Sequence, residues 1–201
     1  MGKNFSRNNA SGKRKDSDFY ETPYCLTRTF LEADEDSWLL SPSIVEPACG
    51  RGAITKVLND FGFLNITEYD LMVHGKDFQE DEHEYEYLIT NPPYSLAYEF
   101  ILHAKKIIGQ RFAMLLPLTY LQGSKRLKEI WSYKQFPLES VYVFNRYPML
   151  GVPLREDGKV KTGMQSYAWY VWSRAWKGHE PRIRWLDIDK YILKKGDDAK
   201  A

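Results

Sequence analysis

Residues 43–61 read SIVEPACGRGAITKVLNDF. The β-branched residues at the start predict a short strand that ends in the acid Glu46, and the apolar residues from Ala53 onward recur at helical spacing. Between strand and helix lies a loop with Gly50 and Gly52, which lack a Cβ and let a ligand approach the backbone closely. The stretch therefore predicts a strand, a glycine loop and a helix, the repeating unit of an α/β domain.

The remaining chain continues this alternation. A helix is expected to begin after Thr22, with Pro23 in its first turn. Further helices are expected over 97–108 and 124–133, and further strands over 64–70, 87–89, 111–117, 141–144 and 167–172. This order predicts a doubly wound, mostly parallel sheet, in which ligands bind outside the carboxyl ends of the strands. One edge of the sheet should therefore gather the acids and loops that follow the strands, namely 46–52, Glu68, Asp70, Asp77 and 91–94.

The composition is that of a globular protein with room for a core. Of the 201 residues, 43% are hydrophobic and 27% are charged, and the net charge of +1 excludes a general polycation. We expect one domain over 18–193, between a disordered basic arm (1–17) and a flexible tail (194–201). Cys25, Cys49 and four scattered histidines match neither a disulfide framework nor a metal site, so no metal is expected. No apolar run reaches the length of a membrane span, which predicts a cytoplasmic protein without membrane contact.

A stiff loop, Asn91-Pro92-Pro93-Tyr94, follows the strand over 87–89. The two prolines fix φ and remove two backbone donors, so neither helix nor sheet continues through them. The loop presents the Asn91 amide, the carbonyls of Asn91 and Pro92, and the flat ring of Tyr94. This set suits a planar group that bears an amino function. On these residues alone, an ordinary proline turn at a strand end is equally consistent.

The glycine loop matches no phosphate-binding fingerprint. A dinucleotide motif would place a third glycine where Thr55 stands, and no Gly-Lys-Ser/Thr sequence is present. Glu46 directly before the loop disfavours a polyanion and favours a ligand with a cationic group, such as a nucleoside that carries an amino acid and a sulfonium. Glu68 and Asp70 after the next strand would then accept ribose hydroxyls. The alternative interpretation is that Glu68 and Asp70 are solvent-exposed acids at the end of a strand, with no role in binding.

Residues 46–54, followed by Thr90-Asn91-Pro92-Pro93-Tyr94, resemble the S-adenosylmethionine motif and the catalytic motif of DNA adenine-N6 methyltransferases. The likeness spans residues 19–173 and is greatest to small phage-type members without a separate target-recognition domain. It implies a Rossmann-like class I methyltransferase fold, mostly parallel with an antiparallel edge strand. It further implies S-adenosylmethionine as cofactor, double-stranded DNA as substrate, and a bacterial host cell in which a phage could encode the enzyme. We expect a monomer or a weak dimer.

The resemblance also implies residue roles. Asn91 Oδ1 and the Pro92 carbonyl would accept the two N–H bonds of the adenine amine, and Tyr94 would stack on the extruded base. Pro93 completes the catalytic set. The implied cofactor-binding residues are Tyr20, Thr22, Glu46, Pro47, Ala48, Cys49, Gly50, Gly52, Ala53, Glu68, Asp70, Asp77, Phe78 and Asn91.

The resemblance implies that different residues of this set bind different parts of S-adenosylmethionine. Glu46, which replaces the more frequent aspartate, would hold the methionine part, with Thr22 near its carboxylate. Asp70 would hold the ribose, with Glu68 as the alternative. Asp77 would bind the amino group of the cofactor beside Phe78.

Without a target-recognition domain, DNA contacts fall to the basic arm, to residues 118–128 or to residues 145–165. The candidates are Lys13, Arg14, Lys15, Tyr120, Lys125, Arg126, Arg146, Arg155, Lys159 and Lys161. A solubilising tail and a solvated charged loop are the alternatives for these positions. Tyr120, Tyr147 and Met149 are candidates for a wedge at the base pair, with a core role as the alternative.

Related chemistry leaves two other functions open. Enzymes with the same tetrad methylate exocyclic amines of ribosomal RNA bases or a glutamine amide of release factors, although these usually carry an additional N-terminal domain. A non-enzymatic nucleic-acid-binding module with a decayed site is a third possibility. The intact tetrad argues against it.

Overall fold

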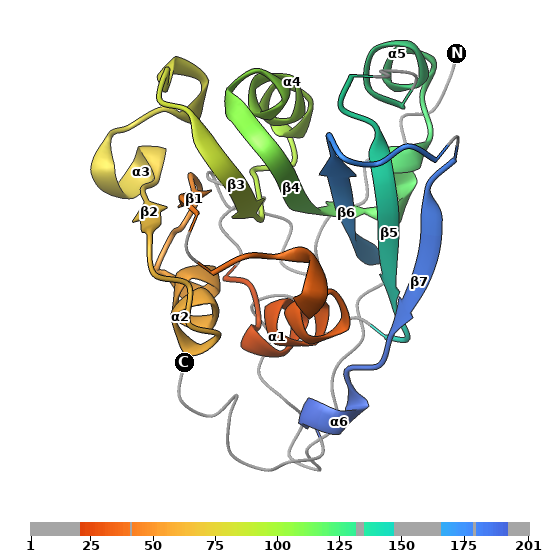
Figure 1. Ribbon diagram of the computed structural model, residues 1–201, viewed down its shortest axis with the longest axis horizontal. Helices are drawn as coiled ribbons and strands as arrows, with labels where there is room; N and C mark the ends of the chain where they lie inside the picture. The colour runs from red at the N-terminus through yellow and green to blue at the C-terminus, as the bar shows by residue number, and fades with distance from the viewer. Residues whose placement is uncertain (1–20, 41, 132–134, 147–165, 179, 193–201) are drawn as a thin grey trace, which may run out of the picture.

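The computed structural model describes residues 21–40, 42–131, 135–146, 166–178 and 180–192. A seven-stranded sheet forms its centre (Figure 1), with the strand order β2-β1-β3-β4-β6-β5-β7. The strands are β1 (Ile44–Glu46), β2 (Ile66–Glu68), β3 (Tyr85–Thr90), β4 (Ile108–Pro117), β5 (Leu138–Phe144), β6 (Tyr167–Ser173) and β7 (Arg182–Leu186). The helices are α1 (Tyr24–Ala33), α2 (Ala53–Asp60), α3 (Leu71–His74), α4 (Ala97–Ile107), α5 (Ser124–Arg126) and α6 (Asp189–Ile192), with the shorter turns η1 (Glu35–Ser37), η2 (Phe78–Glu80), η3 (Leu118–Leu121) and η4 (Leu127–Trp131).

The sheet is mostly parallel, as predicted. Strands β2, β1, β3 and β4 run parallel to one another, and β7 runs parallel to β5. The antiparallel strand is β6, which pairs with β4 on one side and β5 on the other. We expected that strand at an edge, and this detail is wrong because β5 pairs with β6 on its far side and β7 adds beyond β5. Strand β7 was not predicted from the sequence, and only Leu186 of its five residues is buried.

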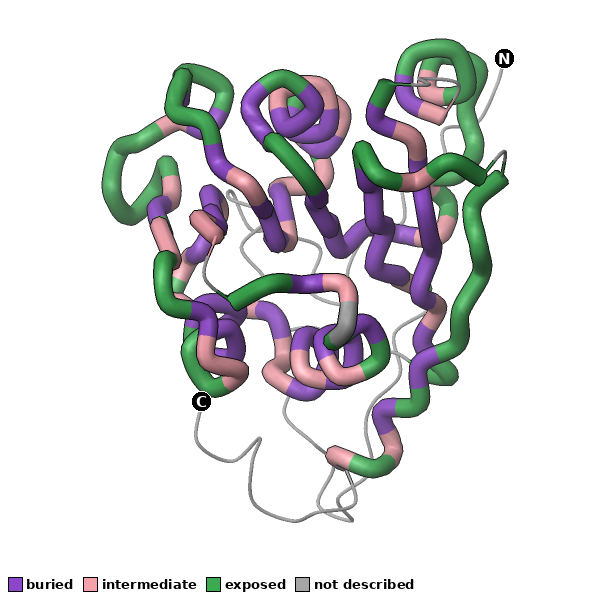
Figure 2. The backbone as a smooth tube through the Cα atoms, in the orientation of Figure 1, coloured by how far each residue is buried: buried purple, intermediate pink, exposed green. Residues whose placement is uncertain are grey.

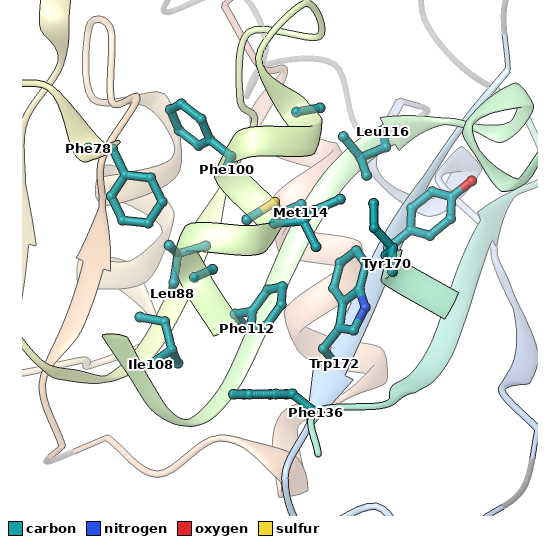
Figure 3. Packing of buried hydrophobic residues seen from close by; sticks show 14 of the residues in the cluster. Phe78, Leu88, Phe100, Ile108, Phe112, Met114, Leu116, Phe136, Tyr170 and Trp172 are labelled. Carbon is teal, nitrogen blue, oxygen red and sulfur yellow. The ribbon is translucent and has the colours of Figure 1, made fainter. Parts of the chain in front are cut away.

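Two apolar layers cover the sheet. Along β4, Phe112 and Met114 pack on the face covered by α4, whereas Ala113 and Leu115 pack on the face covered by α1 and α2. Figure 2 shows the buried strands between exposed outer turns, and Figure 3 shows the α4 face, where the rings of Phe112 and Trp172 stack at 4.7 Å. Since α2 and α4 lie on opposite faces, the chain reverses its winding direction between β1 and β3. This is the topological switch point at which doubly wound sheets bind ligands.

The carboxylate of Asp34 ties the end of α1 to the middle of the sheet. It accepts hydrogen bonds from the Tyr142 hydroxyl (2.6 Å), from Nε1 of Trp38 (3.0 Å) and from the guanidinium of Arg111 (2.6 Å). Arg111 also pairs with Glu139 at 2.5 Å, and all three charged side chains are buried. The network therefore fixes the position of α1 relative to β4 and β5.

Replacing Asp34 by alanine should lower the free energy of unfolding by about 3–5 kcal/mol, because it leaves a buried guanidinium without one of its partners. The matched control is Asp60→Ala, which breaks the partly exposed Arg28–Asp60 pair at 3.0 Å and should cost less than about 1 kcal/mol. Urea unfolding followed by circular dichroism measures both values. Equal losses in the two variants would contradict the role of the Asp34 network.

Candidate active site

The loops predicted to bind ligands lie at the carboxyl ends of three adjacent strands. Strand β1 pairs with β2 on one side and with β3 on the other, and Glu46 is opposite Glu68 in the register. The glycine loop after β1 and the loop after β3 are therefore neighbours. Both flank the switch point of the sheet.

Glu46 is a fully buried carboxyl group at the end of β1. Its Oε1 accepts hydrogen bonds from the Ala48 backbone N–H at 2.9 Å and from the Thr90 hydroxyl at 2.6 Å. Its Oε2 is buried and has no hydrogen-bond partner among the described residues. Burial is the main cause that raises the pKa of Glu46 to about 8, with the nearby acids Asp70 and Glu68 acting in the same direction and the two hydrogen bonds acting against them. An unpaired buried acceptor of this kind suits a cationic ligand group.

The glycine loop depends on two left-handed residues. Gly50 has φ of 53° and Gly52 has φ of 80°, a region that side chains with a Cβ disfavour. Gly52 is the residue before α2 and has no side chain that could cap the start of that helix by a hydrogen bond. A Cβ on Gly52 would lie 3.7 Å from Oε2 of Glu68, so the loop passes directly beside that carboxylate. The loop residue Cys49 is buried, and burial raises its pKa to about 12, which keeps the thiol neutral.

The two acids that follow β2 have different surroundings. Asp70 Oδ1 accepts from the N–H groups of Met72 (2.7 Å) and Val73 (3.2 Å) and caps α3, while its Oδ2 accepts from the Gly50 N–H at 3.2 Å. Both of its oxygens are therefore engaged. Glu68 is exposed, lies beside the glycine loop and makes no hydrogen bond with another described residue.

The Asn91 amide is held in one orientation. Its Nδ2 donates to the Thr22 hydroxyl at 2.9 Å, and Thr22 is buried just ahead of α1. Its Oδ1 is buried and has no hydrogen-bond partner in the part of the chain that the structure describes. The Leu96 N–H donates to the Pro93 carbonyl at 2.8 Å, which turns the loop into α4. An acceptor oxygen is thus fixed next to a buried proline.

The remaining predicted cofactor residues divide between the loop and the core. Pro47 is buried and Ala48 and Ala53 flank the glycines, whereas Asp77 Oδ1 accepts from the Gln79 N–H at 2.9 Å and starts η2. Phe78 is only 1% exposed and packs against Phe100, as Figure 3 shows, at a ring distance of 4.9 Å. The ring of Phe78 therefore packs in the core, and its place beside the cofactor stays a prediction. Tyr20 lies outside the described residues.

Two residues near the site were not predicted from the sequence. The Thr90 hydroxyl donates a hydrogen bond to Glu46. In the sequence, only its position before Asn91 at the end of a buried strand indicated that Thr90 would lie near the site. Tyr167 at the start of β6 lies beside Tyr94, with ring centroids 5.3 Å apart and planes inclined by 34°. The sequence placed Tyr167 in a strand without indicating which edge it would reach.

Of the DNA-contact candidates, four are described. The Lys125 ammonium lies 3.9 Å from the centre of the Tyr98 ring, and the Arg126 guanidinium lies 4.5 Å from that of Tyr120. Arg146 forms an ion pair with Asp189 at 2.5 Å. Lys13, Arg14, Lys15, Arg155, Lys159 and Lys161 lie outside the described residues, as do Tyr147 and Met149.

Two features are absent from the part of the chain that the structure describes. It contains no group of three or more histidine, cysteine, aspartate or glutamate side chains arranged to hold a metal ion. It also contains no helix of the length and apolarity needed to cross a membrane.

Solved structures with the same architecture are known, although a scan against protein-family models and a search of curated proteins find no match. A protein from Pyrococcus horikoshii, provisionally described as an RNA methyltransferase, shares 13% identity at a TM-score of 0.57, over 84% of this chain and 93% of that one. Magnesium protoporphyrin IX methyltransferase from Synechocystis was solved with bound S-adenosylmethionine. It shares 15% sequence identity at a TM-score of 0.51, over 74% of this chain and 76% of that one. The type IIG restriction endonuclease BpuSI shares 16% sequence identity at a TM-score of 0.57, over 83% of this chain and 26% of that one. The chain has the class I methyltransferase fold.

Glu46 should reduce the stability of the free protein as the pH rises. The pKa of its carboxyl group is about 8 in the folded state and near the ordinary 4.5 in the unfolded state, so the folded state binds more protons between these values. Stability from this group is complete below pH 4.5 and is lost as the pH rises toward 8. Glu46→Gln should therefore gain stability relative to wild type between pH 5 and pH 9, by more than about 1 kcal/mol.

Urea unfolding at the two pH values measures this gain. Glu84→Gln is the matched control, because Glu84 is exposed and is not among the charged groups that shift the pKa of Glu46, so its substitution should give the same difference from wild type at both pH values. A Glu46→Gln difference that does not change with pH would contradict the buried titration.

Proposed function

We propose that this chain transfers a methyl group from S-adenosylmethionine to the exocyclic N6 amine of adenine in DNA. The observation that carries the proposal is the buried, unpartnered Oδ1 of Asn91, whose amide orientation is set by the bond from Nδ2 to Thr22. An acceptor held in this way next to a rigid Pro-Pro segment suits a donor from outside the protein. The N–H bonds of an amine supply such a donor.

The chemistry of the amine explains why acceptors matter. The lone pair of an aromatic amine is delocalised into the ring, so the nitrogen is a poor nucleophile. Asn91 Oδ1 and the Pro92 carbonyl would accept its two N–H bonds and favour a pyramidal nitrogen with an available lone pair. Tyr94 would hold the extruded base by stacking. Catalysis would then rest on positioning and electrostatic preorganisation.

The residues around the glycine loop fit the proposed cofactor. The free Oε2 of Glu46 would accept from the ammonium of its methionine part, and the two left-handed glycines leave room beside the loop backbone. When bound, S-adenosylmethionine would supply a methyl carbon whose bond to the sulfonium breaks as the bond to nitrogen forms, leaving a neutral thioether and a methylated nitrogen that loses one N–H proton to solvent. We assign the ribose to Glu68 instead of Asp70, because both oxygens of Asp70 already accept bonds from the protein.

The proposed DNA substrate rests on the resemblance to adenine-N6 enzymes, because enzymes that act on RNA bases or on a glutamine amide carry the same tetrad. One structural neighbour is a restriction endonuclease, which is consistent with a DNA substrate. Other neighbours are described as methyltransferases of RNA or of a porphyrin. The test is transfer of a labelled methyl group from S-adenosylmethionine to unmethylated duplex DNA, followed by digestion to nucleosides. We expect the label in N6-methyladenine. Label that enters only RNA or protein in parallel reactions would overturn the substrate assignment.

Asn91→Ala should reduce methyl transfer by about 10²–10³-fold, the usual loss when one preorganised polar group is removed from a reaction centre. Cofactor affinity, measured by calorimetry, should stay within about threefold of wild type, because Asn91 is proposed to act on the amine. Ser95→Ala, an exposed position in the same loop, serves as the control with full activity. If cofactor binding were lost along with transfer, Asn91 would have a structural role.

Glu68→Ala and Asp70→Ala should separate ribose binding from loop support. Glu68→Ala should weaken cofactor binding by about 10- to 100-fold, the worth of a hydrogen bond to a charged group, without lowering the melting temperature. Asp70→Ala removes the cap of α3 and should cost about 1 kcal/mol of stability. Calorimetric titration and thermal unfolding measure the two effects. The reverse pattern would assign the ribose to Asp70.

A further inference from the structure

Thr90 connects the two loops of the site. It is the last residue of β3, it is fully buried, and its hydroxyl donates to Oε1 of Glu46 at 2.6 Å. The next residue in the chain is Asn91. One short side chain therefore lies between the acid before the glycine loop and the amide of the Pro-Pro loop.

The backbone around Thr90 leaves this side chain little freedom. Thr90 is paired with Met114 of β4, and two residues earlier Leu88 is paired with Val45 of β1. Thr90 thus lies between two strands that are locked in register, where the side chain of a β-branched residue has few rotamers. The hydroxyl keeps its direction toward Glu46 without help from solvent.

We infer that Thr90 is a positioning residue that fixes the spacing between the carboxylate of Glu46 and the amide of Asn91. This inference rests on the proposed function, in which Glu46 holds the methyl donor and Asn91 holds the amine. A 1 Å change in such a spacing is enough to slow a transfer reaction strongly. Thr90 itself touches neither ligand.

The same hydrogen bond directs the second oxygen of Glu46 to the ligand. Oε1 is occupied by Thr90 and by the Ala48 N–H, so Oε2 is the acceptor left for an ammonium group. The charged groups that face Glu46 are the acids Glu68 and Asp70, which raise its pKa, with the neutral thiol of Cys49 beside them. The Thr90 hydroxyl lowers the pKa of Glu46, because it donates to the charged form.

A variant without this hydroxyl should therefore bind the cofactor less well near neutral pH. An ammonium group prefers the ionised carboxylate, so affinity should rise with pH through the pKa of Glu46. Loss of the hydroxyl raises that pKa further and moves the midpoint of the rise to higher pH. The amino group of the cofactor titrates identically for every variant, so differences between variants report on the protein.

The test compares Thr90→Val, which keeps the shape and removes the hydroxyl, with Thr90→Ser, which keeps the hydroxyl. The matched control is Thr27→Val in α1, another fully buried threonine, whose hydroxyl has no hydrogen-bond partner among the described residues. Calorimetric titration with S-adenosylmethionine between pH 6 and pH 9.5 gives affinity against pH. Single-turnover methyl transfer at saturating cofactor and high pH gives the rate of the chemical step.

We expect Thr90→Val to shift the affinity midpoint to higher pH and to slow transfer by about 10-fold or more, whereas Thr90→Ser stays close to wild type. An unchanged midpoint and rate in a folded Thr90→Val protein would overturn the inference, and so would equal effects in Thr27→Val. If wild type binds the cofactor but does not methylate DNA, the substrate proposal fails and the pH arm still tests Thr90. Absence of cofactor binding in wild type would overturn both.

Discussion

The loops at the C-terminal ends of the parallel strands are arranged around one constraint, the buried carboxyl group of Glu46. A charged carboxylate without a cation is costly inside a protein, and this site holds two more acids nearby. The protein instead retains a proton on Glu46, with the pKa at about 8, and satisfies only one of its two oxygens. The site is therefore stable as a neutral acid and gains most from a cationic ligand. Stability has been given up where binding is needed.

The two loops beside Glu46 are rigid for different reasons. The glycine loop holds its shape through two positive φ angles and through the bond from the Gly50 N–H to Asp70. The loop after β3 is rigid because of its prolines and because Thr22 fixes the Asn91 amide. Thr22 comes just before α1, and Asp34 anchors the far end of that helix. A buried ion network distant from the edge thus contributes to the direction of the proposed catalytic oxygen.

Much of this arrangement could be predicted from the sequence, because local patterns determine it. The strand, glycine loop and helix from Ile44 to Asp60 are visible as a β-branched run, two glycines and a helical period, and the structure contains them. Strand β7 was missed since its alternating arginines and its exposed Trp185 resemble no buried strand. The sequence alone cannot show whether an aromatic ring such as that of Phe78 packs in the core or lines a binding site. Nor can it show that Asp70 is already engaged as a helix cap.

The strand order suggests how two ligands would share one edge. The glycine loop and Glu68 lie on the β1 and β2 side, which we assign to the cofactor. The Asn91 loop lies on the β3 side, and η3 and α5, with Lys125 and Arg126, follow directly after β4 on the same side. These two cations lie over tyrosine rings, whereas Arg146 forms an ion pair with Asp189. The polymer would therefore approach over β3 and β4, and methyl donor and amine would meet at the switch point between β1 and β3, where Thr90 bonds to Glu46.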